Sequence, residues 1–184
     1  MRISNDYYLI VDLEATCSDD GAVPRQEMEI IEIGAVMQNS RSFEVDSEFQ
    51  TFVRPVRHPE LTDFCKALTG IEQPNVASAP PFAHAIEAMK QWMDSFNDSI
   101  FCSWGDYDRK QILQDCEYHH VGYPFQSAHL NLKAEFSRTV GLSKKMGIRG
   151  ALRHIGLKFE GSPHRGIDDA KNIARIVRRV IAGV

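Results

Sequence analysis

The stretch that decides the fold is YYLIVDLEATC, residues 7–17. From Tyr7 to Asp12 it is an apolar run rich in aromatic and branched side chains, as a buried β-strand requires. Side chains alternate between the faces of a strand, so Asp12 and Glu14 project to one side. A pair of carboxylates on one face of a buried strand is costly, and a bound cation is the usual remedy. The alternative is that the strand simply ends there and both acids are solvated.

The next two segments predict antiparallel neighbours for this strand. Glu29 to Met37 (EIIEIGAVM) and Glu48 to Val53 (EFQTFV) flank the polar turn QNSRS at residues 38–42. Apolar runs separated by a short polar turn are typical of a hairpin. The chain is therefore expected to begin with an antiparallel meander.

The rest of the chain reads mainly as helices. A helical spacing of apolar residues after a proline pair predicts a helix over Phe82 to Phe96, and Ile100 to Trp104 reads as a short buried strand. Strands first and alternating helices afterwards indicate an α/β sheet with helical layers. The later helices are expected over Asp108 to His119, Leu132 to Val140, Ile148 to Ile155 and Asp168 to Ile181.

The segment GDYDRKQIL, residues 105–113, contains two aspartates, Asp106 and Asp108, and either could be the next acid of the candidate site. If a helix begins here, Asp108 lies four residues before Ile112 and shares its inward stripe. Asp106 is better explained as an N-cap or first-turn acid that the helix dipole favours. Asp108 is therefore the candidate site residue.

The same test separates the adjacent acids of PHRGIDDAKNIARIVRRV, residues 163–180. Asp169 precedes the apolar residues of the helix at helical spacing, which places it on the stripe that faces the sheet. Asp168 aligns with the polar face instead. His164 stands in the loop just before this helix and can act as a base if a partner lies beside it. Together with Asp12, Glu14 and Asp108, these residues could bind two divalent ions and place a base beside an attacking water.

Composition sets broad limits on the class of protein. The 184 residues, 43% hydrophobic, are enough for one domain with a full core. No apolar run approaches the length of a membrane span and no export signal opens the chain, so a cytoplasmic protein with no membrane partner is expected. The four cysteines form no CxxC pair and are expected to be reduced. A net charge of −4 disfavours a broad basic nucleic-acid surface, although bound cations would reverse the field at an acidic site.

Several motifs, in this order and spacing, resemble those of the Eri-type (enhanced RNA interference) 3'-to-5' exoribonucleases, which belong to the DEDDh branch of the ribonuclease H-like superfamily. The resemblance covers nearly the whole chain. The motifs are VDLEATC, MEIIEIG, FVRP, LTDFCKALTGI, SWGDYDRKQIL and GLKFEGSPHRGIDDAKNIARI.

The resemblance implies a ribonuclease H-like α/β fold with a central mixed five-stranded sheet flanked by helices, as a single exonuclease domain over residues 1–184. It implies that four carboxylates bind two divalent ions, Mg²⁺ or Mn²⁺, and that His164 is the general base. The substrate would be a nucleic acid, RNA with a free 3' end, trimmed to nucleoside 5'-monophosphates. The four carboxylates are Asp12, Glu14, Asp108 and Asp169.

An exonuclease needs a pocket that accepts a free 3' end, and two groups of residues are candidates for binding the last bases. Tyr107 and the turn from Leu68 to Ile71 can equally be core residues. One group is Tyr107 with the turn Leu68, Thr69 and Ile71, and the other is Ala15 and Thr16, directly after the strand acids.

Two other functions fit parts of the sequence. A haloacid-dehalogenase-type phosphatase also has an aspartate at the end of its first strand, but Glu14 is the wrong second acid and no later catalytic lysine is evident. A non-catalytic RNA-binding module on the same fold would require the loss of a site residue, and all five residue types are present.

Overall fold

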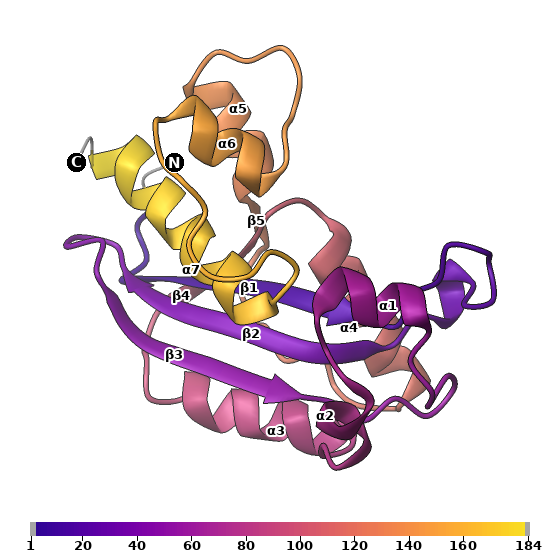
Figure 1. Cartoon of the computed structure of the whole chain (residues 1–184). Helices are drawn as coiled ribbons and strands as arrows, with labels where there is room; N and C mark the ends of the chain where they lie inside the picture. Colours follow the sequence, from indigo (N-terminus) through magenta and orange to yellow (C-terminus); the bar gives the residue numbers. More distant parts are fainter. Residues whose placement is uncertain (1–2, 183–184) are drawn as a thin grey trace.

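A mixed five-stranded sheet lies at the centre of the computed structural model, which describes residues 3–182 (Figure 1). The strand order is β3-β2-β1-β4-β5, so the predicted α/β fold with a five-stranded mixed sheet is confirmed. The strands are β1 (Tyr7–Ala15), β2 (Ile30–Asn39), β3 (Val45–Phe52), β4 (Ser99–Ser103) and β5 (Leu130–Asn131).

The first three strands form the predicted meander. β1 pairs antiparallel with β2, and β2 pairs antiparallel with β3 across the QNSRS turn. β3 therefore lies at the sheet edge and does not contact β1 through the ladder. On its other side β1 pairs in parallel with β4, but only as far as Ile10 opposite Cys102. Beyond Ile10 this edge of β1 is open, and the two acids of the strand lie there.

All five predicted helices are present, with bounds that differ by a few residues at the ends. None of the helices in the described part of the chain is both long and apolar enough to span a bilayer. The helices are α1 (Asp63–Thr69), α2 (Gln73–Ala77), α3 (Phe82–Met93), α4 (Tyr107–Tyr118), α5 (Leu132–Thr139), α6 (Ile148–His154) and α7 (Gly166–Val177), with a 3-10 turn at Arg25–Glu27 and a π turn at Arg178–Ala182.

Helices cover both faces of the sheet, and alternate residues of β1 enter different cores. Tyr8 and Ile10 pack with α5, α6 and α7 on one face. Leu9, Val11 and Leu13 pack with α3 and α4 on the other. Figure 1 shows α7 across one face and α3 beneath the opposite one. Because Asp12 and Glu14 continue the series of Tyr8 and Ile10, they face the layer that contains α7.

Two glycines let α7 begin directly on the sheet. A Cβ atom on Gly34 in β2 would lie 2.1 Å from the backbone carbon of Gly166, the first residue of α7. A Cβ on Gly166 would lie 2.8 Å from the carbonyl oxygen of Asp12. Asp12 and Gly34 are partners across β1 and β2. The absence of side chains at both glycines therefore brings the first turn of α7 against the acidic end of β1.

The structure also contains elements that the sequence analysis missed. α1 and α2 are too short to show a helical period, and β5 contains only two residues. The predicted turn over Leu68 to Ile71 is partly wrong, since Leu68 and Thr69 form the last turn of α1. Gly70 ends that helix in the left-handed conformation, with a φ of 66°.

Candidate metal centre and cleft

Three carboxylates from two elements meet at the end of β1. One oxygen from each of Asp12, Glu14 and Asp169 lies within 4.8 Å of the others. Glu14 is only 9% exposed and Asp12 is half-buried, so the alternative of two solvated strand-end acids is contradicted. Oxygen donors gathered at this spacing in a buried site fit a hard divalent cation such as Mg²⁺ or Mn²⁺.

Asp108 approaches the same site from the opposite helical layer. It lies in the first turn of α4, is 4% exposed, and accepts a hydrogen bond from the backbone N–H of Leu13 at 3.2 Å. That N–H lies beyond the end of the β1–β4 ladder and is free to bind a side chain. Asp108 is thus fixed to β1 between Asp12 and Glu14.

In each of the two aspartate pairs, Asp106/Asp108 and Asp168/Asp169, the residue predicted to lie on the inward stripe of its helix is the one that lines the cleft. Asp169 is buried and lines the cleft, whereas Asp168 accepts a hydrogen bond from the backbone N–H of Ser162 at 2.8 Å, outside the cleft. Asp106 occupies the N-cap position of α4, as predicted, but its side chain makes no capping hydrogen bond. Instead one Asp106 oxygen lies 3.8 Å from Nδ1 of His129.

Burial and mutual repulsion make the acidic cluster hold protons when no cation is bound. Burial raises the pKa of Asp12 well above its ordinary value, and Asp108 and Asp169 raise it further. Burial followed by repulsion from Asp169 and Glu32 raises the pKa of Glu14 to about 9. These shifts show that the fold alone does not compensate the charges. A divalent cation would supply the missing compensation.

The pKa values of the other two carboxyl groups are shifted less, because hydrogen bonds oppose burial. Burial raises the pKa of Asp108 to about 6, while N–H groups of its own backbone and of Leu13 lower it. Burial likewise raises the pKa of Asp169 to about 6, opposed by the backbone N–H groups of His164 and Arg165. Both groups therefore ionise more readily than Glu14.

Another buried acid beside the cluster, Glu32, has its own partners within the fold. It lies opposite Glu14 on β2, and its Oε2 accepts hydrogen bonds from Arg165 Nε and from the Gly166 N–H, each at 3.1 Å. The ion pair with Arg165 offsets part of the charge of Glu32 and ties the start of α7 to the sheet. Glu32 is therefore a positioning residue, which the sequence analysis missed.

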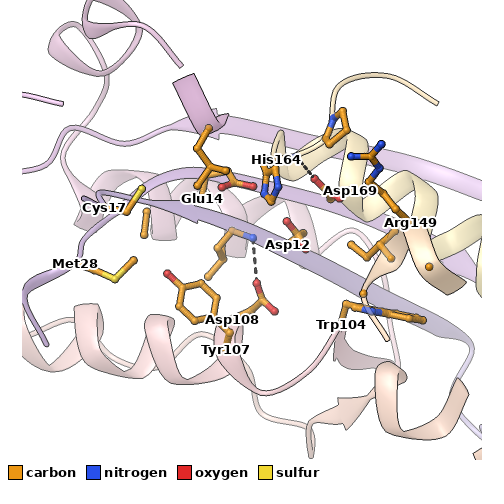
Figure 2. A pocket seen from close by; sticks show the side chains of 17 residues that line it. Asp12, Glu14, Cys17, Met28, Trp104, Tyr107, Asp108, Arg149, His164 and Asp169 are labelled. Carbon is orange, nitrogen blue, oxygen red and sulfur yellow. Dashed lines mark hydrogen bonds between the residues drawn. The ribbon is translucent and has the colours of Figure 1, made fainter. Parts of the chain in front are cut away.

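His164 lies on a strained turn at the rim of the cluster. Its φ of 61° is rare for a residue with a side chain, and its backbone N–H donates to Asp169 Oδ2 at 2.7 Å. The side chain is exposed, and Figure 2 shows the ring turned toward Asp12 and Glu14. One short turn thus orients the Asp169 carboxylate and places an imidazole beside it.

The cluster lies in a cleft of about 450 Å³. All five predicted site residues line it, and Figure 2 shows acids and aromatic rings facing each other across it. The residues that line it are Asp12, Leu13, Glu14, Ala15, Cys17, Met28, Leu68, Trp104, Tyr107, Asp108, Gly147, Ile148, Arg149, Gly150, Pro163, His164 and Asp169.

Three of the six residues predicted to bind substrate line the cleft, namely Ala15, Leu68 and Tyr107. The other three are buried away from it, so the structure corrects their assignment. Thr16 accepts a hydrogen bond from the Glu29 N–H at 2.9 Å, Thr69 donates to the Cys65 carbonyl at 2.8 Å, and Ile71 is fully buried beside Cys65.

The cleft-lining residues that the sequence analysis missed include Met28, Trp104 and Arg149. Trp104 follows β4, and its indole N–H donates to the Met146 carbonyl at 3.0 Å. Arg149 is the only Lys or Arg among the cleft-lining residues in the described part of the chain. The glycines around it in MGIRG are a signal for close approach to a ligand that could have identified this segment.

Comparisons with known proteins agree with this arrangement. The family model RNase_T, described as an exonuclease, matches residues 9–177. ERI1 exoribonuclease 3 of Mus musculus is 38% identical over 181 residues, 94% of this chain and 52% of that protein. The 3'-5' exoribonuclease 1 of Homo sapiens is 32% identical over 185 residues, 96% of this chain and 52% of that protein. The chain thus spans about half the length of these curated relatives.

A solved structure extends the agreement to three dimensions. The nuclease domain of 3'hExo, described as a DEDDh family member bound to rAMP, superposes with a TM-score of 0.92 at 31% identity. The match covers 100% of this chain and 95% of that domain. Taken with the RNase_T match, which extends over most of the sequence, this likeness shows that the chain belongs to the exonuclease family RNase_T and to its DEDDh members.

Proposed function

We propose that the protein is a divalent-metal-dependent 3'-to-5' exonuclease that removes nucleoside 5'-monophosphates from single-stranded RNA or from 3' overhangs. The observation that carries the proposal is the meeting of Asp12, Glu14 and Asp169 oxygens within 4.8 Å, with Asp108 beside them. Family membership and the named exoribonuclease relatives support the reaction class.

The metal ions would be held by the carboxylates of Asp12, Glu14, Asp108 and Asp169. When bound, they would neutralise the acids and stabilise the charge that develops on the phosphate and on the leaving 3' oxygen. Without them, the acids of the cleft would repel a phosphate. Asp169 is held for this task by the His164 N–H, and Asp108 by the Leu13 N–H.

His164 is the general base of the proposed reaction. Its exposed ring faces the acidic cluster and can take a proton from the attacking water. The turn that carries the ring also binds Asp169, so the base lies beside this carboxylate. In-line attack would cleave the bond to the 3' oxygen and leave the phosphate on the released nucleotide.

The walls of the cleft suit a terminal base and ribose. Tyr107, Leu68 and Ala15 line one part of it with apolar or aromatic surface. Burial raises the pKa of the Tyr107 phenol, so its O–H stays neutral and remains a hydrogen-bond donor. The 3'hExo nuclease domain was solved bound to rAMP, which supports a ribonucleotide as the occupant here.

Two alternatives have less support. A haloacid-dehalogenase-type phosphatase needs a catalytic lysine, and none lines the cleft within residues 3–182. A non-catalytic RNA-binding module would need a defective site, whereas the five predicted residues all line one cleft. An aspartyl-phosphate intermediate would support the phosphatase.

The test is cleavage of 3'-labelled and 5'-labelled single strands of RNA and DNA with Mg²⁺, Mn²⁺ or EDTA. We expect a ladder of 5'-labelled products that shortens with time, faster on RNA, and no cleavage in EDTA. A circular strand is the control and should remain intact. Undiminished cleavage in EDTA, or cuts in the circle, would exclude the proposed function.

A further inference from the structure

One segment of this acidic chain is strongly basic. Residues 136–159 contain six Lys and Arg residues and no Asp or Glu, although the whole chain carries a net charge of −4. The segment runs from within α5 through α6 into the irregular connection before α7, and we call it the basic lobe. A run of charged residues usually forms an ordinary solvated surface. Its position relative to the cleft therefore decides whether it can bind a ligand of the cleft.

The basic lobe is fixed to the core by its apolar residues. Phe136, Ala151 and Leu152 are fully buried in the core that contains α7. The Trp104 indole N–H binds the Met146 carbonyl at 3.0 Å and joins the lobe to the end of β4. The apolar side of the lobe is held against the core, and its charged side chains are exposed to solvent.

The charged side chains are available to a ligand. Lys144, Lys145, Arg149 and Arg153 are exposed, and none of them forms an ion pair with another residue of the range 3–182. Arg149 and Arg153 lie four residues apart on α6 and therefore share one face of that helix. The lobe thus carries uncompensated positive charge.

This charge begins at the wall of the cleft. Gly147 to Gly150 line it, and Figure 2 places Arg149 on the same side as His164 and Asp169. Arg153 lies one turn further along α6, and Lys144 and Lys145 lie in the segment that leads to Gly147. A strand whose 3' end lies in the cleft would meet one cation near the reacting phosphate and further cations upstream.

We propose that the basic lobe binds the phosphate backbone of the single-stranded nucleic acid whose 3' end occupies the cleft. Arg149 contacts the phosphate nearest the reacting one, and Arg153, Lys144 and Lys145 contact phosphates further upstream. This proposal rests on the proposed exonuclease function. Backbone contacts of this kind give affinity without reading the base sequence, and they weaken as salt rises.

A second groove offers a competing exit for the strand. It is lined by Arg25, Gln26, Tyr107 and Lys110, among others, and shares Tyr107 with the cleft. It holds two basic residues, whereas the lobe exposes five that make no ion pair within the described chain, namely the four named above and Lys158. The lobe therefore supplies more charge to a phosphate backbone and is the favoured exit.

The test compares a long and a short substrate with the same 3' end. A strand of about 12 nucleotides reaches the lobe, whereas a dinucleotide is confined to the cleft. In the variant K144A/K145A/R153A we expect the ratio of kcat/KM on the long strand to that on the dinucleotide to fall by about tenfold or more. The plot of log affinity against log salt should flatten by about 2, at about 0.7 for each lost phosphate contact.

The matched control is the triple variant R41A/K90A/R178A, which removes the same charge from surfaces outside the cleft and the lobe. We expect it to keep both the ratio and the salt slope. An unchanged ratio in the lobe variant would overturn the proposal, as would a drop caused by R25A/K110A instead. Failure of the wild-type protein to cleave either substrate would defeat the exonuclease function itself.

Discussion

The substitution Glu14→Gln should stabilise the metal-free protein while it removes a proposed metal ligand. Glu14 is 9% exposed and lies within 4.8 Å of Asp12 and Asp169 through its carboxylate oxygen. Burial, followed by repulsion from Asp169 and Glu32, raises its pKa from 4.5 to about 9. Glutamine keeps the shape of the side chain and cannot ionise.

The sign follows from proton linkage. Between pH 4.5 and about pH 9 the folded state keeps a proton on Glu14 that the unfolded state has released. Stability of the metal-free protein should therefore fall as pH rises through this window. Each pH unit above the ordinary pKa of 4.5 lowers the free energy of unfolding by about 1.4 kcal/mol. At pH 7 the protonation of Glu14 therefore costs the metal-free protein about 3 kcal/mol of stability.

The gain from Glu14→Gln should be smaller than this cost, because the glutamine amide must find hydrogen-bond partners in a buried site. We expect about 1 to 3 kcal/mol, or a rise in Tm of roughly 3 to 10 °C for a chain of this size. In saturating Mn²⁺ the order should reverse. Wild type gains about 4.1 kcal/mol when free metal is about 1,000-fold above Kd, and the variant, which lacks one proposed ligand, gains less.

The assay is urea and thermal unfolding of both proteins in EDTA at about pH 5, 7 and 8, repeated at pH 7 with Mn²⁺. The exposed Glu117 on α4 provides a matched Glu→Gln control, which should change neither the stability nor its pH dependence. A Glu14→Gln variant that is less stable than wild type in EDTA at pH 7 would refute the account of the cluster as a source of repulsion.

The remaining predictions concern the other acids, the base and the packing of α7. Asp108→Asn should lower kcat by at least about 10²-fold, while Asp106→Asn keeps most activity, as steady-state assays can show; the reverse result would contradict the helix phase. His164→Ala should lower kcat by about 10² to 10⁴-fold and remove the pH–rate inflection in single-turnover profiles, with metal affinity by calorimetry largely retained. Gly34→Ala places a Cβ 2.1 Å from backbone of α7 and should cost about 2 kcal/mol or more in urea unfolding, unlike Gly122→Ala, whose Cβ meets nothing within 4 Å.

The sequence predicted on which face of its strand or helix each site carboxylate lies, because the face depends on local periodicity. The period of a strand places Asp12 and Glu14 on one face, and the period of a helix places Asp169 on the buried stripe and Asp168 off it. The structure agrees in each case. The strand-then-helix order was likewise enough to predict an α/β sheet, because each long element carries its own apolar pattern.

Contacts between distant segments could not be predicted in this way. Glu32 and Arg165 are separated by 133 positions, and no local pattern indicates that they pair. The capping role expected of Asp106 failed for a similar reason, since its carboxylate lies near His129 of a later loop instead. The preference for acids at helix starts predicts where such a residue lies in the chain. It does not predict which group the side chain contacts.

Buried and cleft-facing residues in one short motif were also indistinguishable from sequence. Leu68 and Ile71 are both apolar, yet one lines the cleft and the other is fully buried. The seven residues of α1 are too few to show which face is inward. Helix length therefore limits what periodicity can reveal about the substrate pocket.

The distance between the acids depends on packing that offsets their repulsion. Asp12 and Asp169 approach each other because α7 begins on β1 and β2, where Gly34 and Gly166 leave room for backbone contact. Repulsion in the metal-free cluster favours separating these elements, while burial of the apolar stripe of α7 favours contact, at about 1.5 to 3 kcal/mol for each large side chain. Burial of several such side chains contributes more free energy than the protonation of one acid costs. The fold can therefore hold the site assembled before any metal binds. The free energy of cation binding would then not be reduced by the cost of bringing β1 and α7 together.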